Sequence, residues 1–154
     1  MLGAKNPFET GEVHVQMMKE AGTLVGEKLI RSVLLINAAG SAVCGLLLLA
    51  AAGAVSDWTG LESQAALRET GLFLIVVVCF LLWTATRSVI LPRVVLAFAV
   101  IDALWVVGSA VVLGESGSAL TAFGVLAIVL VAVAVGIFAV FEALYFWRNR
   151  SFGR

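Results

Sequence analysis

Charged residues are scarce in this sequence. Asp, Glu, Lys and Arg together make up 13% of its 154 residues, whereas 62% of the residues are hydrophobic. A typical soluble domain has about 25% charged residues. A soluble fold of this length cannot bury so much apolar surface, so we expect lipid to surround most of the chain. The net charge is zero and the basic residues form no stripe, which excludes nucleic-acid binding.

Side chains that carry metal or enzyme chemistry are also few. Cys44 and Cys79 both fall inside apolar runs, without a second cysteine or a histidine at metal-ligand spacing. Such cysteines behave as small apolar residues. His14, the single histidine, is interpreted as a surface residue, with tetrapyrrole ligation as the alternative. Phosphate-binding glycine loops, nucleophile elbows and paired-histidine zinc motifs do not occur. The sequence therefore predicts no enzyme activity, no cofactor and no metal site.

Four apolar segments are long enough to cross a membrane, which takes about 20 helical residues. They are continuous, whereas the strands of a membrane barrel alternate in polarity. A helix also satisfies its backbone groups internally, as lipid requires. We therefore predict an all-α fold, a four-transmembrane-helix bundle. The spans are expected at about residues 33–55, 66–86, 94–113 and 119–147.

Nine of the ten basic residues lie on one side of these spans. They occur before the first span, between the second and third spans, and in the tail, and only Arg68 lies on the other side. The positive-inside rule then predicts that both termini are cytoplasmic.

The segment before the first span has a pattern of its own. Apolar residues recur there at helical spacing, with charges on the other faces: Val13, Met17, Ala21, Leu24, Val25 and Leu29. We predict an amphipathic helix at the membrane interface, with a partly ordered tail as the alternative. Asn6-Pro7 and Gly11 predict that residues 1–11 are irregular. Residues 1–31 thus form a cytoplasmic or interfacial segment, and residues 32–154 form the transmembrane domain.

The two halves of the transmembrane domain look like copies of each other. Ile36-Asn37-Ala38 returns 65 residues later as Ile101-Asp102-Ala103, and Trp83 returns 64 residues later as Trp147. Both halves would run in the same sense, so we predict two parallel-repeat helical hairpins. Duplication predicts that Asn37 and Asp102 lie at similar depth.

The candidate site consists of the polar side chains within the spans. Asp102 and Glu142 are intramembrane acids, which are costly in lipid and usually mark a site or find a partner. Counting along the helices from Arg93 and Arg148 places both acids in the cytoplasmic half of the bilayer. With inward-facing Asn37 and Ser41 they would form one intramembrane cluster.

Two interpretations of this cluster remain open. In the functional one, the two carboxylates share a proton at a proton or cation site. In the structural one, the polar residues tie helices together, or Glu142 meets Arg87 or Arg148 at the interface.

The chain resembles a group of small uncharacterised four-helix bacterial inner-membrane proteins, a family without assigned function. The similarity covers about residues 28–148 and is carried by these segments: Leu34-Leu35-Ile36-Asn37-Ala38-Ala39-Gly40-Ser41, Gly45-Leu46-Leu47-Leu48-Leu49, Gly60-Leu61, Leu67-Arg68, Gly71-Leu72-Phe73, Leu81-Leu82-Trp83 and Asp102-Ala103-Leu104-Trp105-Val106-Val107. The resemblance implies four helices in a bacterial cytoplasmic membrane. It implies no biochemical activity.

Three functions are compatible with these observations. The first is a non-catalytic accessory subunit that packs against a larger membrane complex, because the chain is small and has no reactive constellation. The second is a small homo-oligomeric proton- or cation-coupled transporter or channel with Asp102 and Glu142 at its site. The third is a lipid or pigment binder. The expected partners are membrane lipids and other membrane subunits or further copies of the chain.

Overall fold

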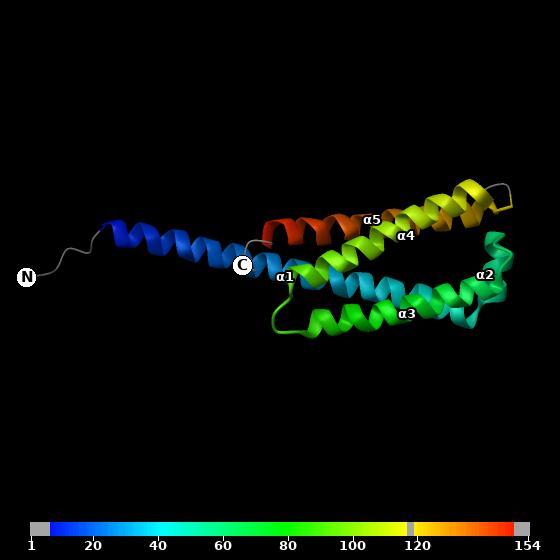
Figure 1. The fold of residues 1–154 in the computed structure, drawn as a ribbon, viewed down its shortest axis with the longest axis horizontal. Coiled ribbons are helices and arrows are strands. Elements are labelled where there is room, and N and C mark those ends of the chain that lie inside the picture. The colour runs from blue at the N-terminus through cyan, green and yellow to red at the C-terminus, as the bar shows by residue number, and fades with distance from the viewer. Residues whose placement is uncertain (1–6, 117–118, 150–154) are drawn as a thin grey trace, which may run out of the picture.

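The computed structural model describes residues 7–116 and 119–149, and every regular element in these ranges is a helix (Figure 1). The helices are α1 (Pro7–Ala50), α2 (Ala52–Thr59), α3 (Gln64–Thr86), α4 (Pro92–Ser116) and α5 (Ala122–Asn149). Four are long and apolar enough to cross a membrane: Val25–Ala50 of α1, and all of α3, α4 and α5. This confirms the all-helical fold with four candidate spans. The last three spans begin and end within three residues of the predicted positions.

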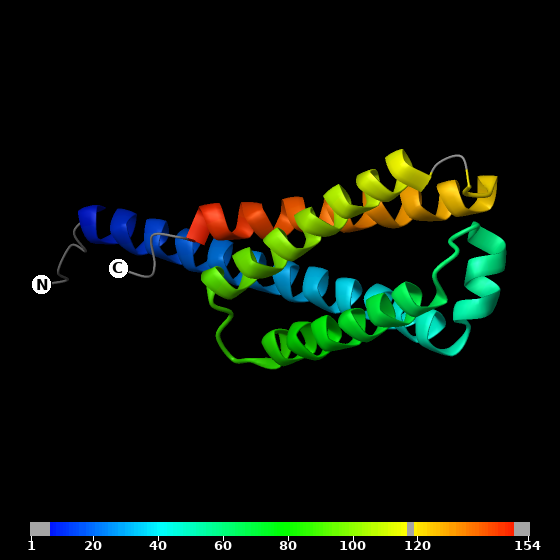
Figure 2. The same cartoon turned by 45° about the vertical axis from the view of Figure 1, so that its right-hand side comes forward.

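The first span ends earlier than predicted. Hydropathy extends it to Val55, but α1 ends at Ala50 and Ala51 leaves the helical conformation, with φ −129° and ψ 31°. The chain then forms α2, which lies across one end of the bundle (Figures 1 and 2). The break falls within Ala50-Ala51-Ala52-Gly53, so the apolar run continues through it. α2 ends at Gly60, whose φ of 79° is a left-handed conformation that suits glycine.

The helix that precedes the first span begins earlier than predicted and is continuous with that span. α1 begins at Pro7, so residues 7–11 are helical rather than irregular, and residues 1–6 lie outside the described ranges. Proline suits the first position of a helix, where its missing N–H costs nothing. At 44 residues, α1 is about 66 Å long, so its first part projects well beyond the other helices (Figure 1). No break at residue 31 or 32 separates this part from the span, and its interfacial position stays a prediction.

The four spans pair as two hairpins. α1 packs along α3, α4 packs along α5, and contacts between α1 and α5 join the two pairs (Figure 2). At the α1–α3 crossing a Cβ on Gly45 would lie 3.1 Å from the carbonyl oxygen of Gly71, so the two glycines let the backbones approach closely. The four candidate spans are thus arranged as two sequence-adjacent pairs. The duplication itself stays a prediction.

Helix α2 connects the two hairpins at its end of the bundle, which we call the α2 end. Thr121 N donates to the carbonyl oxygen of Thr59 at 3.0 Å, and Thr121 Oγ1 donates to that of Trp58 at 2.5 Å. Thr121 Oγ1 also accepts from Gly124 N at 3.0 Å, at the start of α5. One threonine therefore satisfies groups at the C-terminus of α2 and at the N-terminus of α5.

Gly124→Ala should destabilise this junction by about 1–3 kcal/mol, the usual cost of overpacking. A Cβ on Gly124 would overlap the carbonyl group of Thr59, which is backbone and cannot rotate away. Gly136→Ala is the matched control on the same helix, because its Cβ would meet only Val106 Cγ2, at an ordinary 3.6 Å. Thermal unfolding in detergent should show a lower melting temperature for Gly124→Ala alone. Equal melting temperatures for the two variants would contradict the tight junction.

Candidate functional site

The structure brings together all four polar residues of the candidate site. Asn37 on α1 donates through Nδ2 to Asp102 Oδ2 of α4 at 2.8 Å, and the same Nδ2 lies 3.5 Å from Glu142 Oε1 of α5. Ser41 Oγ donates to Asn37 Oδ1 at 3.2 Å. We call Asn37, Ser41, Asp102 and Glu142 the polar cluster. It joins three of the four spans across the middle of the bundle.

Helix geometry explains how these residues meet. Asn37 and Ser41 are four residues apart on α1, so they share one face of that helix. Asn37 also lies near the middle of the candidate span Val25–Ala50. Its hydrogen bond to Asp102 places these two side chains beside each other in the bundle, while equal depth in a membrane stays a prediction. Polar groups at this depth face the protein because lipid offers them no partner.

Burial is nearly complete in the cluster. Glu142 is 0% exposed, Asn37 is 2% exposed and Asp102 is 6% exposed. Within the described part of the chain, Glu142 Oε2 has no hydrogen-bond partner, so its proposed pairing with Arg87 or Arg148 is not seen. The Arg87 guanidinium instead lies 4.3 Å from the centre of the Trp83 ring. A buried carboxylate oxygen without a donor is costly, so the cluster is not optimised as a structural tie.

A cavity of about 120 Å³ adjoins the cluster. All four spans contribute to its wall, and Asn37, Ser41 and Asp102 form its polar side. From this level the cavity extends along α1 as far as Cys44, towards the α2 end. Its aromatic lining comes from three different helices: Phe73, Trp105 and Phe138. Asp102 therefore lies beside an open space in the bundle, whereas Glu142 is packed behind it and does not line this space.

The opposite side of the cluster is closed by apolar side chains. We call this side the loop end, because it holds the loop 87–91 between α3 and α4. Leu34, Leu81 and Val95 are each 0% exposed there and belong to one continuous buried cluster that includes Ile90 and Phe98. The polar cluster thus has a cavity on its α2 side and a packed apolar layer on its loop side.

Two polar side chains near the site have roles that the sequence does not indicate. Trp105, one turn after Asp102, lines the cavity, and its buried Nε1 has no partner among the described residues. Arg31 donates to the carbonyl oxygens of Ala85 and, at 3.0 Å, Arg87, at the C-terminus of α3. A cation suits that end of a helix. Both features depend on which helices pack together, and a hydropathy profile carries no information about helix packing.

Comparisons with protein-family models, with curated proteins and with solved structures found no match. The likeness to small four-helix bacterial inner-membrane proteins therefore stays an expectation from the sequence. The inference of function depends on the geometry of the polar cluster and its cavity.

Proposed function

We propose that this chain is a small membrane carrier in which Asp102 and Glu142 hold either a proton or a monovalent cation. The observation that supports this most is the sharing of one donor by two buried carboxylates. Asn37 Nδ2 is 2.8 Å from Asp102 Oδ2 and 3.5 Å from Glu142 Oε1, and Glu142 Oε2 has no partner in the described structure.

Electrostatics explains why such a pair would exchange ions. Two carboxylates that both reach the same amide nitrogen in an apolar core repel each other, and this neutral amide does not compensate two negative charges. A bound proton or cation reduces the negative charge of the pair. Within the described residues, His, Cys, Asp and Glu side chains do not gather in groups of three or more. The donor set therefore suits a proton or a monovalent cation better than a transition metal.

The surroundings of the cluster also suit a carrier. Alternating access requires that a central site communicates with one side of the membrane at a time. Here the cavity lies on the α2 side of the carboxylates, and the layer around Leu34 and Leu81 closes the loop side. The spans are unbroken at the level of the cluster, so opening towards the loop end would require whole helices to move.

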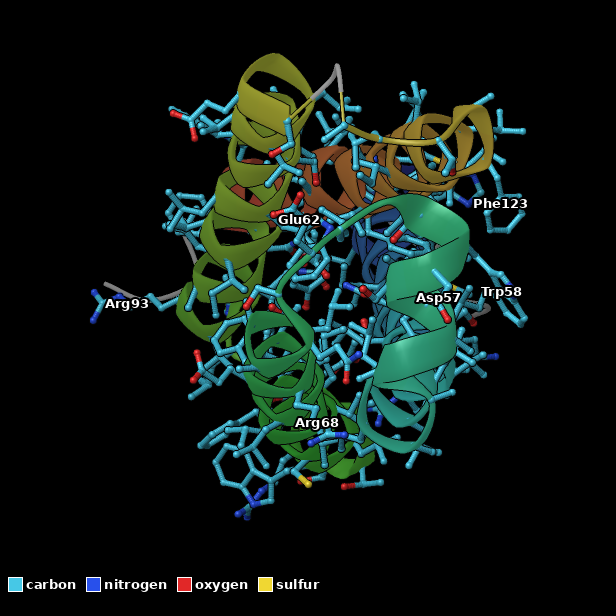
Figure 3. All side chains as sticks on the ribbon, turned by 90° about the vertical axis from the view of Figure 1, so that its right-hand side faces the viewer. Asp57, Trp58, Glu62, Arg68, Arg93 and Phe123 are labelled. Atoms are coloured by element: carbon cyan, nitrogen blue, oxygen red, sulfur yellow. The ribbon has the colours of Figure 1, made fainter. Side chains whose placement is uncertain are left out.

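The direction of exchange follows from the proposed orientation. The resemblance noted in the sequence implies a bacterial cytoplasmic membrane, and we place both termini and the loop end in the cytoplasm because Arg87, Arg93 and Arg148 lie at that end. Figure 3 looks onto the α2 end, where the acids Asp57 and Glu62 lie together with Arg68. Arg93, which is also labelled, belongs to the first turn of α4 at the opposite end. The cavity would then face the outside in this conformation.

Proton movement in proteoliposomes tests the proposed function. The purified chain is reconstituted with a pH-sensitive dye inside the vesicles, a pH gradient is imposed, and Na⁺, K⁺ and small organic ammonium ions are added one at a time. At least one cation should collapse the gradient faster than in protein-free vesicles. A wild-type chain that responds to none of them would remove the carrier proposal.

A second candidate function, the accessory subunit, is favoured by the projecting part of α1. Residues 12–18 are all exposed and extend beyond the bundle, and they include Val13, Val15, Met17 and Met18, which are each about half exposed or more. Such a helix would serve as a docking arm for a larger complex on the cytoplasmic side. Affinity purification of the native protein in mild detergent should then recover a stoichiometric partner that a chain lacking residues 1–20 does not retain. A monodisperse monomer without a partner would argue against this role.

A further inference from the structure

The cavity beside the polar cluster has a mixed lining that restricts what it can bind. Asn37, Ser41 and Asp102 form its polar side, and the rest of the lining is mostly apolar, with three aromatic side chains. A carboxylate together with aromatic rings is the environment that proteins use to hold organic cations. The inference that follows rests on the proposed carrier function and concerns the cation that this cavity selects.

Size limits the ligand to a small molecule. An engineered cavity of about 150 Å³ in another protein holds benzene, which has six non-hydrogen atoms. The present cavity measures about 120 Å³. It therefore accommodates a ligand of roughly four to six non-hydrogen atoms. A bare inorganic cation would leave most of the apolar wall without contacts.

The indole group of Trp105 adds a second requirement. Its Nε1 is a donor only, and this atom is buried without an acceptor among the described residues, in a side chain that lines the cavity. A buried donor without an acceptor costs free energy that a ligand acceptor would recover. Asp102 and Trp105 are three residues apart on α4, so their side chains lie on the same face with Cβ atoms about 5–6 Å apart. A ligand with an ammonium group and an oxygen acceptor a few bonds apart would serve both residues.

We infer that this cavity binds a short amino alcohol, with its ammonium group on Asp102 and its hydroxyl oxygen accepting from Trp105 Nε1. Ser41 Oγ, beside Asp102 in the wall, offers the ammonium group a further acceptor. The carbon atoms between the two polar groups contact the aromatic rings of Phe73 and Phe138. The carrier would then exchange this organic cation for a proton.

Binding of two matched amines tests the inference. Ethanolamine and n-propylamine have the same number of non-hydrogen atoms, but only ethanolamine carries the oxygen acceptor. Each is titrated into the detergent-solubilised full chain and followed by ligand-observed NMR, for the wild type, Trp105→Phe, Asp102→Asn and the exposed control Trp58→Phe. The affinity ratio of ethanolamine to propylamine should fall about 3–10-fold in Trp105→Phe, the value of one neutral hydrogen bond. Trp58→Phe should keep the wild-type ratio, and Asp102→Asn should lose both amines.

The outcomes separate this inference from the carrier proposal. An unchanged ratio in Trp105→Phe, or no binding of either amine to the wild type, would overturn the amino alcohol as ligand. Cation-driven proton movement with Na⁺ or K⁺ would then leave the carrier standing. Conversely, a ratio that depends on Trp105, in a chain that moves no protons, would support the binding site and remove the carrier.

Discussion

Asn37→Leu should destabilise the bundle by about 1–3 kcal/mol, the cost of leaving buried polar groups without their partner. The Asn37 side chain is the donor that reaches both Asp102, at 2.8 Å, and Glu142, at 3.5 Å. Leucine has the same branching at Cγ but no hydrogen-bond donor, so the two acids would stay buried without the amide N–H that they share. Thermal unfolding in detergent should show the lower melting temperature directly.

A triple variant provides the control for this prediction. Asn37→Leu, Asp102→Leu and Glu142→Leu together remove the donor and both acceptors, and apolar side chains of similar shape often replace a buried polar group at little cost or with a gain. The triple variant should therefore recover most or all of the stability that Asn37→Leu loses. If Asn37→Leu melts with the wild type, the hydrogen bonds of the cluster contribute nothing to the fold.

The positions of the spans and the members of the polar cluster could be predicted from the sequence for one physical reason. In lipid, a continuous apolar segment indicates a spanning helix, and a polar residue within that segment indicates a side chain that faces other helices. An uninterrupted apolar run of about 20 residues has to be a helix that spans, and a polar side chain within it has to turn inward. The sequence alone therefore predicts that Asn37, Asp102 and Glu142 lie close together. In the structure, the amide nitrogen of Asn37 reaches both carboxylates.

A hydropathy profile does not indicate where a helix ends within an apolar run, or which side chains meet between helices. The break at Ala51 falls within a run of alanines, and α2 is held in place by Thr121, 70 residues further along the chain. The cavity likewise needs Phe73, Trp105 and Phe138 to arrive from three helices. Arg31 contributes to an orientation count in the sequence, but in the structure it binds the carbonyl groups at the end of α3. Each of these features arises from packing between distant segments.

Glu142→Gln and Asp102→Asn should each abolish cation-driven proton movement while the bundle stays folded. Each amide has the shape of the acid it replaces and keeps an oxygen that can accept from Asn37, but it neither releases a proton nor carries the charge that holds a cation. Because each variant removes a buried acid without removing the donor, its melting temperature should equal or exceed that of the wild type.

The proteoliposome assay measures this prediction, with Asp57→Asn as the matched control. Asp57 is an exposed acid on α2, at the end of the bundle seen in Figure 3, so its loss removes one carboxylate without touching the cluster. Asp57→Asn should therefore keep the wild-type rate. If Glu142→Gln and Asp102→Asn keep it as well, the cluster is a structural tie and the carrier proposal fails. Asn37→Leu would lose activity through instability, whereas Glu142→Gln would lose it in a stable fold. Comparing activity with melting temperature in these two variants therefore separates the ion site from the scaffold that holds it.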